Sequence, residues 1–229
     1  KYFKKSWSKY KLKKRKNIIT VAIDSPAAAG AGTQSKLISK HYNLYYLDTG
    51  KIYRYIGKLK LNNPKKFSYT LVKRKFNKLK FKQLENKSLL SDKVAISASI
   101  VAKDKKIRNI VHKFQQKCAY SPPMKYAGSV LDGRDIITIQ VKDAMFKFFI
   151  TANLKERAKR RYKELKSLNK KITLKEVLKS LKNRDKSDRE RRHGPLKKTK
   201  DSILINTTKL SKKTCFIKIK AIMDRKLKS

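Results

Sequence analysis

An apolar run that leads into a loop of very small residues constrains this chain more than any other feature. Residues 18–23 are apolar apart from one threonine, which predicts a buried strand. Residues 25–33 (SPAAAGAGT) carry small side chains, and apolar residues then recur at helical spacing over 37–41. Small side chains let an anion reach backbone N–H groups at the positive end of a helix. The unit therefore favours phosphate binding.

This loop meets the phosphate-binding pattern G-x-x-x-x-G-K-[ST] only in part. Gly30 is present, but Ser25 stands in place of the first glycine and Ala31 in place of the lysine, and the hydroxyl comes one residue late, at Thr33. Loss of such a charged contact costs on the order of 10²-fold in rate. Lys36 is no expected substitute, because helical geometry points it away from position 31. An ordinary strand, turn and helix stays an alternative.

The net charge of +47, from 63 Lys and Arg against 16 Asp and Glu, attracts any polyanion, including RNA and nucleoside phosphates. A merely solvated basic surface explains the same charge. The 229 residues suffice for one or two domains with a real core. No stretch approaches the roughly 18 apolar residues of a membrane span, so we exclude an integral membrane protein. Cys118 and Cys215 form no metal or disulfide pattern, which favours the cytoplasm.

The first 16 residues form a basic segment with interleaved aromatic residues. It lacks the long apolar core of a secretory signal peptide. Runs of this composition are commonly solvated, so we expect a mobile tail over residues 1–16. Stacking of Trp7 and its aromatic neighbours on single-stranded nucleic acid is the alternative function of this segment.

Four further motifs lie at the ends of predicted elements. Strands are expected at 44–47, 129–131, 146–151 and 203–206. The motifs are DTGKIYR at 48–54, DGRD at 132–135, ERAKRR at 156–161 and RDKSDRER at 184–191. In open α/β sheets, ligands bind beyond the carboxyl ends of the strands, which is where the first two motifs fall.

In this order the motifs resemble those of bacterial cytidylate kinase, within the P-loop nucleoside monophosphate kinases, from about residue 18 to the end of the chain. The resemblance implies an α/β fold, with a parallel five-stranded sheet, helices on both faces, a CMP-side insert and a helical lid. It implies a single kinase domain over 17–229, with a largely helical segment at 94–118. The core would comprise 17–56, 127–153 and 197–229, the CMP-side region 57–126 and the lid 154–196.

The implied reaction transfers the γ-phosphoryl group of ATP to CMP or dCMP, with Mg²⁺ and no metal bound directly by side chains. A cytoplasmic monomer without a membrane partner is the expected state. The ATP phosphates would lie on Ser25, Pro26, Ala27, Ala28, Ala29, Gly30, Ala31, Gly32 and Thr33. CMP would contact Thr49, Arg54, Arg108, Asp132, Arg134, Arg184 and Asp188. The catalytic arginines would be Arg134 and, on the lid, Arg157, Arg161 and Arg191.

Two hypotheses remain open from the sequence. One is an active cytidylate kinase, which the paired Asp and Arg residues favour, because guanidinium forks bind phosphate and a polyanion binder needs no such pairs. The other is a kinase-like fold of weak or lost activity that acts as a basic nucleotide- or RNA-binding protein, which Ala31 favours. The insert at 61–92 looks short for the family, so the choice among CMP, dCMP and UMP stays open.

Overall fold

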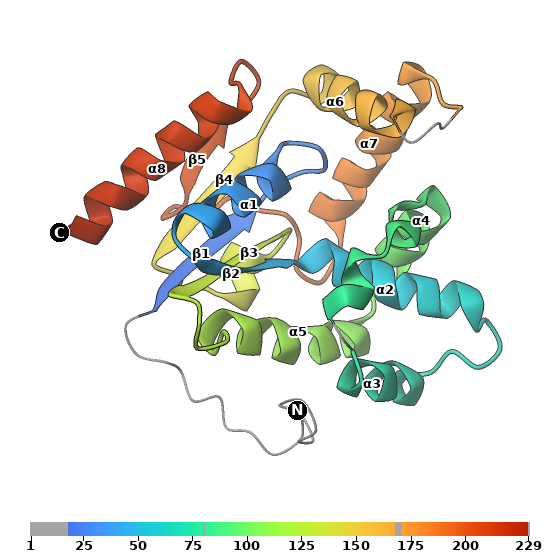
Figure 1. Ribbon diagram of the computed structural model, residues 1–229. Coiled ribbons are helices and arrows are strands. Elements are labelled where there is room, and N and C mark those ends of the chain that lie inside the picture. The colour runs from blue at the N-terminus through green and yellow to red at the C-terminus, as the bar shows by residue number, and fades with distance from the viewer. Residues whose placement is uncertain (1–17, 80, 168–170, 229) are drawn as a thin grey trace.

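The computed structural model describes residues 18–79, 81–167 and 171–228 and contains a parallel five-stranded sheet (Figure 1). The strand order is β2-β3-β1-β4-β5, and every neighbouring pair is parallel. The strands are β1 Ile19–Asp24, β2 Leu44–Asp48, β3 Gly128–Gly133, β4 Phe146–Thr151 and β5 Ile203–Asn206. All five lie where the sequence predicts them, with shifts of one or two residues at some ends. The central strands are nearly continuous apolar runs because helices cover both faces.

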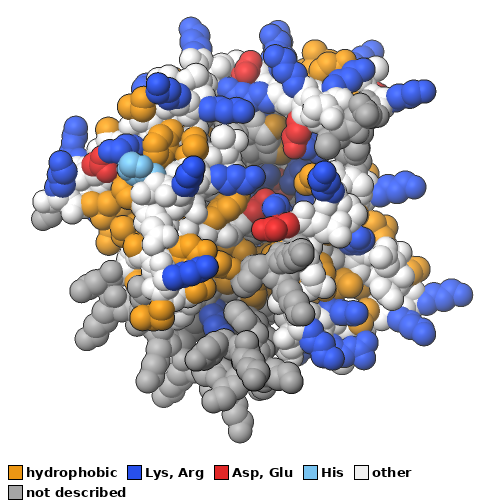
Figure 2. Space-filling model, viewed as in Figure 1, with side chains coloured by type: hydrophobic (Ala, Val, Ile, Leu, Met, Phe, Trp, Pro, Cys, Tyr) orange, Lys and Arg blue, Asp and Glu red, His pale blue; other side chains and the backbone are white. Residues whose placement is uncertain are grey.

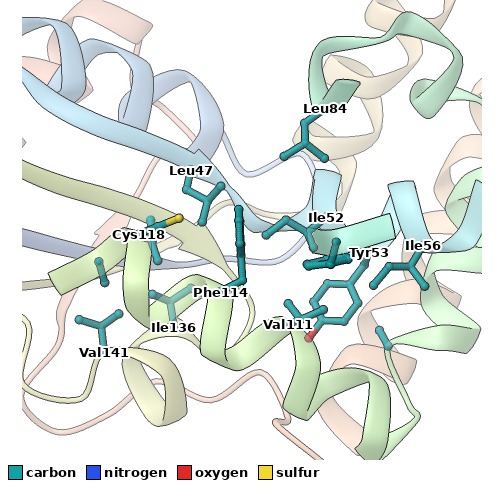
Figure 3. Packing of buried hydrophobic residues seen from close by; sticks show 14 of the residues in the cluster. Leu47, Ile52, Tyr53, Ile56, Leu84, Val111, Phe114, Cys118, Ile136 and Val141 are labelled. Atoms are coloured by element: carbon teal, nitrogen blue, oxygen red, sulfur yellow. The ribbon is translucent and has the colours of Figure 1, made fainter. Parts of the chain in front are cut away.

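Helices α1 (Ala31–His41) and α8 (Lys212–Lys228) cover one face of the sheet, and α5 (Lys105–Tyr120) covers the other (Figure 1). On α5 the apolar residues Ile107, Val111, Phe114 and Cys118 recur at helical spacing and are buried. They pack against β2, the first half of α2 (Thr49–Asn62) and the turn after β3, as Figure 3 shows for Leu47, Ile52 and Ile136 in that order. The predicted α/β fold is confirmed.

The segment between α2 and α5 is helical and contains no described strand. It comprises α3 (Tyr69–Asn77), the short 3₁₀ helices η1 (Phe81–Glu85) and η2 (Lys87–Leu90), and α4 (Asp92–Val101). The helical segment expected at 94–118 is two helices, because Asp104 caps α5 by accepting a hydrogen bond from the Ile107 N–H at 2.9 Å. Gly57 lets α2 and α4 approach closely, since a Cβ there would lie 2.6 Å from the Ala98 nitrogen.

The proposed division at residue 57 falls inside α2, so one helix belongs to both the core and the CMP-side region. The division into core, CMP-side region and lid stays a prediction. The predicted N-terminal tail, residues 1–16, lies outside the described residues. Among the described helices, none has the length and apolar composition needed to cross a membrane.

The predicted lid consists of α6 (Leu154–Lys166) and α7 (Leu174–Glu190), which pack against each other through Leu165, Val177 and Leu181. Ala27, from the loop after β1, belongs to the same apolar cluster. Thr173 and Glu176 form a reciprocal capping box at the start of α7, which fixes where that helix begins. The helix pair therefore packs directly on the small-residue loop.

A buried ion pair joins both helices to that loop. Arg157 on α6 is only 4% exposed and donates two hydrogen bonds to Asp185 on α7, at 3.0 and 2.5 Å. The same guanidinium donates to the backbone oxygens of Ala152, at 2.9 Å, and Ala27, at 3.1 Å. A charge this deeply buried is tolerated because its hydrogen bonds are satisfied.

Replacing Asp185 by alanine leaves the Arg157 guanidinium buried without its counter-ion. We expect this change to lower the free energy of unfolding by about 3–5 kcal/mol, as for other broken buried pairs. The double variant Arg157→Met with Asp185→Leu removes both charges and should lose clearly less. Chemical denaturation of the three proteins checks this, and a loss below about 1 kcal/mol in Asp185→Ala contradicts it.

Candidate active site

A cavity of about 410 Å³ opens at the carboxyl ends of β1, β2 and β3. Its wall is formed by the loop at 25–33, the first turns of α1 and α2, the DGRD segment, and residues of α4, α6 and α7. Figure 2 shows a hollow near the centre of this face, in which acidic and basic side chains meet. This size and place in the fold are typical of a ligand site in an open α/β sheet.

The backbone of the small-residue loop is held in a tight turn. Gly30 has φ 96° and Ala28 φ 60°, both in the left-handed region that glycine adopts most easily. Gly30 is also the N-cap of α1, and it has no side chain to accept from the first helical N–H groups. Those donors and the positive helix end therefore remain available to an anion.

Hydrogen bonds from other segments of the protein fix the backbone of this loop. The Ser25 N–H donates to the Gly133 oxygen at 3.2 Å, and the buried Thr207 hydroxyl donates to the Ala29 oxygen at 2.9 Å. The Thr207 bond and the Arg157 contact to the Ala27 oxygen occupy two loop carbonyls that would otherwise repel a phosphate, and the Ser25 bond ties the start of the loop to the end of β3. The loop is thus preorganised for an anion.

A buried carboxylate fixes the turn that follows DGRD. Asp24, at the end of β1, accepts from the N–H groups of Ile136 and Ile137 at 2.8 and 3.0 Å. Burial and the neighbouring Asp135 raise the pKa of Asp24 to about 7, although the two backbone N–H groups lower it. This anchor holds the π-helical turn η3 (Ile136–Gln140) and with it the direction of the chain at Arg134.

Asp132 lies between the first turns of two helices. Its backbone oxygen accepts from the Thr49 hydroxyl at 2.6 Å, at the start of α2. Its carboxylate accepts from the Tyr46 hydroxyl at 3.2 Å and would lie 3.4 Å from a Cβ placed on Gly32, in α1. Burial and the nearby Asp48 raise the pKa of Asp132, and Arg134 opposes the shift.

Arginines crowd the wall opposite the loop. Arg134 donates to Asp188 at 2.8 Å, which leaves Arg184 farther from that carboxylate, at 3.9 Å. The Arg184 Nε is buried without a hydrogen-bond partner. Burial, together with the nearby Arg134, Arg54 and Arg161, lowers the pKa of Arg184 to about 10, although Asp188 opposes the shift. Such a cluster is complementary to a dianion that is not a protein group.

The cavity brings together most of the residues that the sequence predicted. All nine residues of the loop line it, and so do Thr49, Arg54, Asp132, Arg134, Arg161, Arg184, Asp188 and Arg191. The predicted strand ends explain this, because β1, β2 and β3 are neighbours in the sheet.

Two predicted residues, Arg108 and Arg157, are not part of the cavity wall. Arg108 is buried, pairs with Asp135 and donates to the Ala102 oxygen at 3.3 Å. Gly194, at φ 63°, lets the chain pass this guanidinium, since a Cβ there would lie 2.2 Å from it. The substrate roles assigned to Arg108 and Arg157 stay predictions, and their contacts in this structure support the wall from behind.

The sequence analysis did not name every residue of the wall. Polar and charged side chains that it missed include Lys36, Tyr46, Lys51 and Ser99. Lys36, which we did not expect near the site, lies one helical turn after Gly32 and so shares its face of α1. Lys51 is part of the DTGKIYR motif, where its place in the first turn of a helix was a usable signal. Ser99 lies on α4, outside every motif.

Comparison with known proteins supports the resemblance to cytidylate kinases along almost the whole chain. The family model described as cytidylate kinase matches residues 21–225. A cytidylate kinase of Thermosipho melanesiensis is 38% identical over 218 residues, covering 91% of this chain and 98% of the relative. A cytidylate kinase of Clostridium botulinum is 35% identical over 218 residues, with 90% and 98% covered. One of Bartonella tribocorum is 38% identical over 201 residues, with 86% and 90% covered.

Among solved structures, an uncharacterized protein from Eubacterium ventriosum has a TM-score of 0.52 at 19% identity, with 90% of this chain and 98% of that chain covered. This similarity concerns the fold alone. The family match and the identities of the relatives, together with the motifs gathered around the cavity, show that this chain belongs to the cytidylate kinase family.

Proposed function

We propose that this protein is a cytidylate kinase, which transfers the γ-phosphoryl group of ATP to CMP or dCMP. The observation that carries the proposal is the arginine cluster around Arg184, whose buried Nε has no hydrogen-bond partner and lies 3.9 Å from Asp188. A nucleoside monophosphate supplies further negative charge and hydrogen-bond acceptors as its phosphate dianion. The family match supports the same reaction.

ATP binds through its phosphates to the loop at 25–33 and the N-terminus of α1. The described residues hold no cluster of three or more His, Cys, Asp or Glu side chains suited to a metal. The donor set fits a Mg²⁺ that is carried by the nucleotide, because Mg²⁺ commonly takes most of its ligands from phosphates and water. The Thr33 hydroxyl and the Asp132 carboxylate are the wall oxygens that would hold it. The ion, when bound, neutralises charge on the phosphates.

CMP binds on the opposite side of the cavity. Arg54, Arg134 and Arg184 receive its phosphate, because the guanidinium fork matches two phosphate oxygens. Asp188 stays ionised: burial raises its pKa, but Arg134, Arg184 and Arg191 hold it below the usual value. An ionised carboxylate accepts a hydrogen bond from the cytosine amino group and repels the carbonyl oxygen that uracil carries there. Cytosine is therefore the preferred base.

The reaction needs no covalent intermediate and no general base. An oxygen of the CMP phosphate forms a bond to the γ-phosphorus, and the bond from that phosphorus to the β–γ bridging oxygen breaks. The bridging oxygen leaves with the electron pair as part of ADP. At neutral pH ATP carries about four negative charges and CMP about two, so ADP and CDP at about three each balance them without a proton. The protein positions the reactants and neutralises charge.

Helices α6 and α7 act as the lid. A groove of about 530 Å³ separates them from α4 and continues into the main cavity through Arg161 and Arg184. Ile96 and Ile100 on α4 face this groove and are 65% and 51% exposed. Closure buries these side chains and brings Arg161 toward the reacting phosphates.

The pairing of buried carboxyl groups with arginines favours this function over the alternative of a nucleic-acid-binding protein, since a polyanion binder needs no Asp132 or Asp188 among its arginines. The basic surface can still attract nucleic acid without specificity. A cytoplasmic location and a monomeric state stay predictions.

A coupled assay with ATP and Mg²⁺ tests the reaction against CMP, dCMP, UMP and AMP. We expect turnover with CMP or dCMP at least about tenfold more efficient than with UMP, because uracil has no amino group to donate to the ionised Asp188. Absence of turnover with every acceptor, combined with RNA binding that weakens steeply with salt, would favour the alternative of a basic RNA-binding protein without kinase activity.

Replacing Arg184 by methionine separates binding from stability. The apparent KM for CMP should rise about 10- to 100-fold, because a charge-assisted contact to the phosphate is lost. The unfolding temperature without ligands should stay equal or rise, since the change removes a guanidinium that is repelled by its neighbours and is only weakly paired with Asp188. Arg189→Met, on an exposed position of the same helix, removes the same charge and should change neither property. A fall in unfolding temperature with unchanged KM in Arg184→Met contradicts this account.

A further inference from the structure

The loop at 25–33, which the proposed function assigns to the ATP phosphates, contains no cationic side chain. No residue from Ser25 to Thr33 carries a positive charge, and Ala31 is buried as part of the core under α1. The transferring phosphoryl group nevertheless carries charge on its equatorial oxygens and lies between donor and acceptor. A cation must therefore reach this point from another element, or the rate falls by on the order of 10²-fold.

The cationic side chains on the wall differ in how far they are already engaged. Arg134 pairs with Asp188, Arg54 donates to the Leu89 oxygen at 2.7 Å, and Arg161 pairs with Glu164 at 2.9 Å. Within the described residues, the ammonium groups of the two wall lysines, Lys36 and Lys51, have no hydrogen-bond or carboxylate partner. Arg184 and Arg191 lie 3.9 and 3.7 Å from the Asp188 carboxylate. Among the wall cations that the structure describes, the two lysine side chains are therefore the ones with neither a hydrogen bond nor a carboxylate within 4 Å.

Lys51 is the better placed of the two lysines. It lies in the first turn of α2, is partly buried, and stands three residues before Arg54 on the same face of the helix. Side chains on a helix point toward its N-terminus, which for α2 means toward Asp132 and the cavity. Lys36 is exposed and lies a full turn farther from the start of its own helix.

The ATP side of the cavity, at the start of α1, and the CMP side, at the start of α2, meet at Asp132. The start of α2 is bonded to the Asp132 backbone through Thr49 at 2.6 Å, and Gly32 of α1 lies against the carboxylate of the same residue. A lysine side chain spans about 6 Å from Cα to Nζ, enough to cross from one helix start toward the other. Gly32 leaves this path open, since it has no side chain.

We propose that Lys51 supplies the cation that position 31 lacks, with its ammonium against the phosphoryl group as it passes from ATP to CMP. The inference rests on the proposed function and names a catalytic residue within it. In the transfer already balanced above, Lys51 neither gains nor loses a proton. Its charge stabilises the equatorial oxygens while one P–O bond forms and the other breaks.

The test replaces Lys51 by methionine and compares it with Lys60→Met, a substitution in the last turn of the same helix. We expect kcat to fall about 100-fold in Lys51→Met, with KM for ATP and CMP within about threefold, because the contact is made in the transition state. Lys60→Met should keep the full rate. Circular dichroism of both variants shows that α2 is intact.

The double variant Ala31→Lys with Lys51→Met gives the decisive comparison. If Lys51 replaces the loop lysine, restoring that lysine should recover at least about tenfold of the lost kcat. Binding of a dinucleoside pentaphosphate that joins adenosine to cytidine, measured by calorimetry, should weaken at least about tenfold in Lys51→Met and recover in the double variant. A misfolded Lys51→Met variant would not regain kcat and analogue binding through a second substitution at position 31.

Several outcomes overturn the proposal. One is an unchanged kcat in Lys51→Met, and another is a rise in KM for CMP without a fall in kcat, which would make Lys51 an acceptor-binding residue only. A loss of rate in Lys36→Met with none in Lys51→Met would assign the cation to α1. If the wild-type protein itself shows no turnover with CMP, the proposed function has failed rather than the role of Lys51.

Discussion

Repulsion among partly buried arginines is the constraint on which the site depends. Arg54, Arg134, Arg161 and Arg184 lie close enough together to affect one another, and the Asp188 carboxylate accepts from Arg134 but lies 3.9 Å from Arg184. The protein tolerates this only because neighbouring elements fix the backbone around it. The Asp24 anchor holds the DGRD turn, and the Arg157–Asp185 pair holds α6 against α7. In the proposed function a phosphate dianion relieves this repulsion, so part of the binding affinity would come from charge repulsion that is already present in the folded protein.

Much of this arrangement could be predicted from sequence, because it rests on local patterns. Strands such as Phe146–Thr151 are short apolar runs bounded by turn residues, and the DGRD and RDKSDRER motifs lie at the ends of elements. Once the strand order puts β3 between β1 and β2, their carboxyl ends must share one edge. The resemblance to cytidylate kinases then assigned most of the wall.

The remainder depends on contacts between distant segments, which local patterns do not contain. Whether Arg157 faces a substrate or Asp185 depends on how α6 crosses α7, and Arg108 is drawn to Asp135 by the packing of α5 on the DGRD turn. The break in the helix expected at 94–118 depended on a single cap, Asp104. The sequence analysis excluded Lys36 from the site because helical geometry points it away from position 31. The same geometry puts Lys36 on the face of α1 that carries Gly32, and it lines the cavity. In a chain with 63 basic residues, composition cannot tell a functional lysine from a solvated one.

If relief of charge repulsion at the arginine cluster drives acceptor binding, CMP should stabilise the folded protein much more than cytidine does. The unfolding temperature of the wild-type protein would be followed at constant pH and ionic strength while each compound is titrated. The account predicts a saturable rise with CMP and almost none with cytidine at the same concentrations, because only CMP brings the phosphate dianion. Equal stabilisation by cytidine would show that the base, and not the phosphate, supplies the affinity, and would contradict the account.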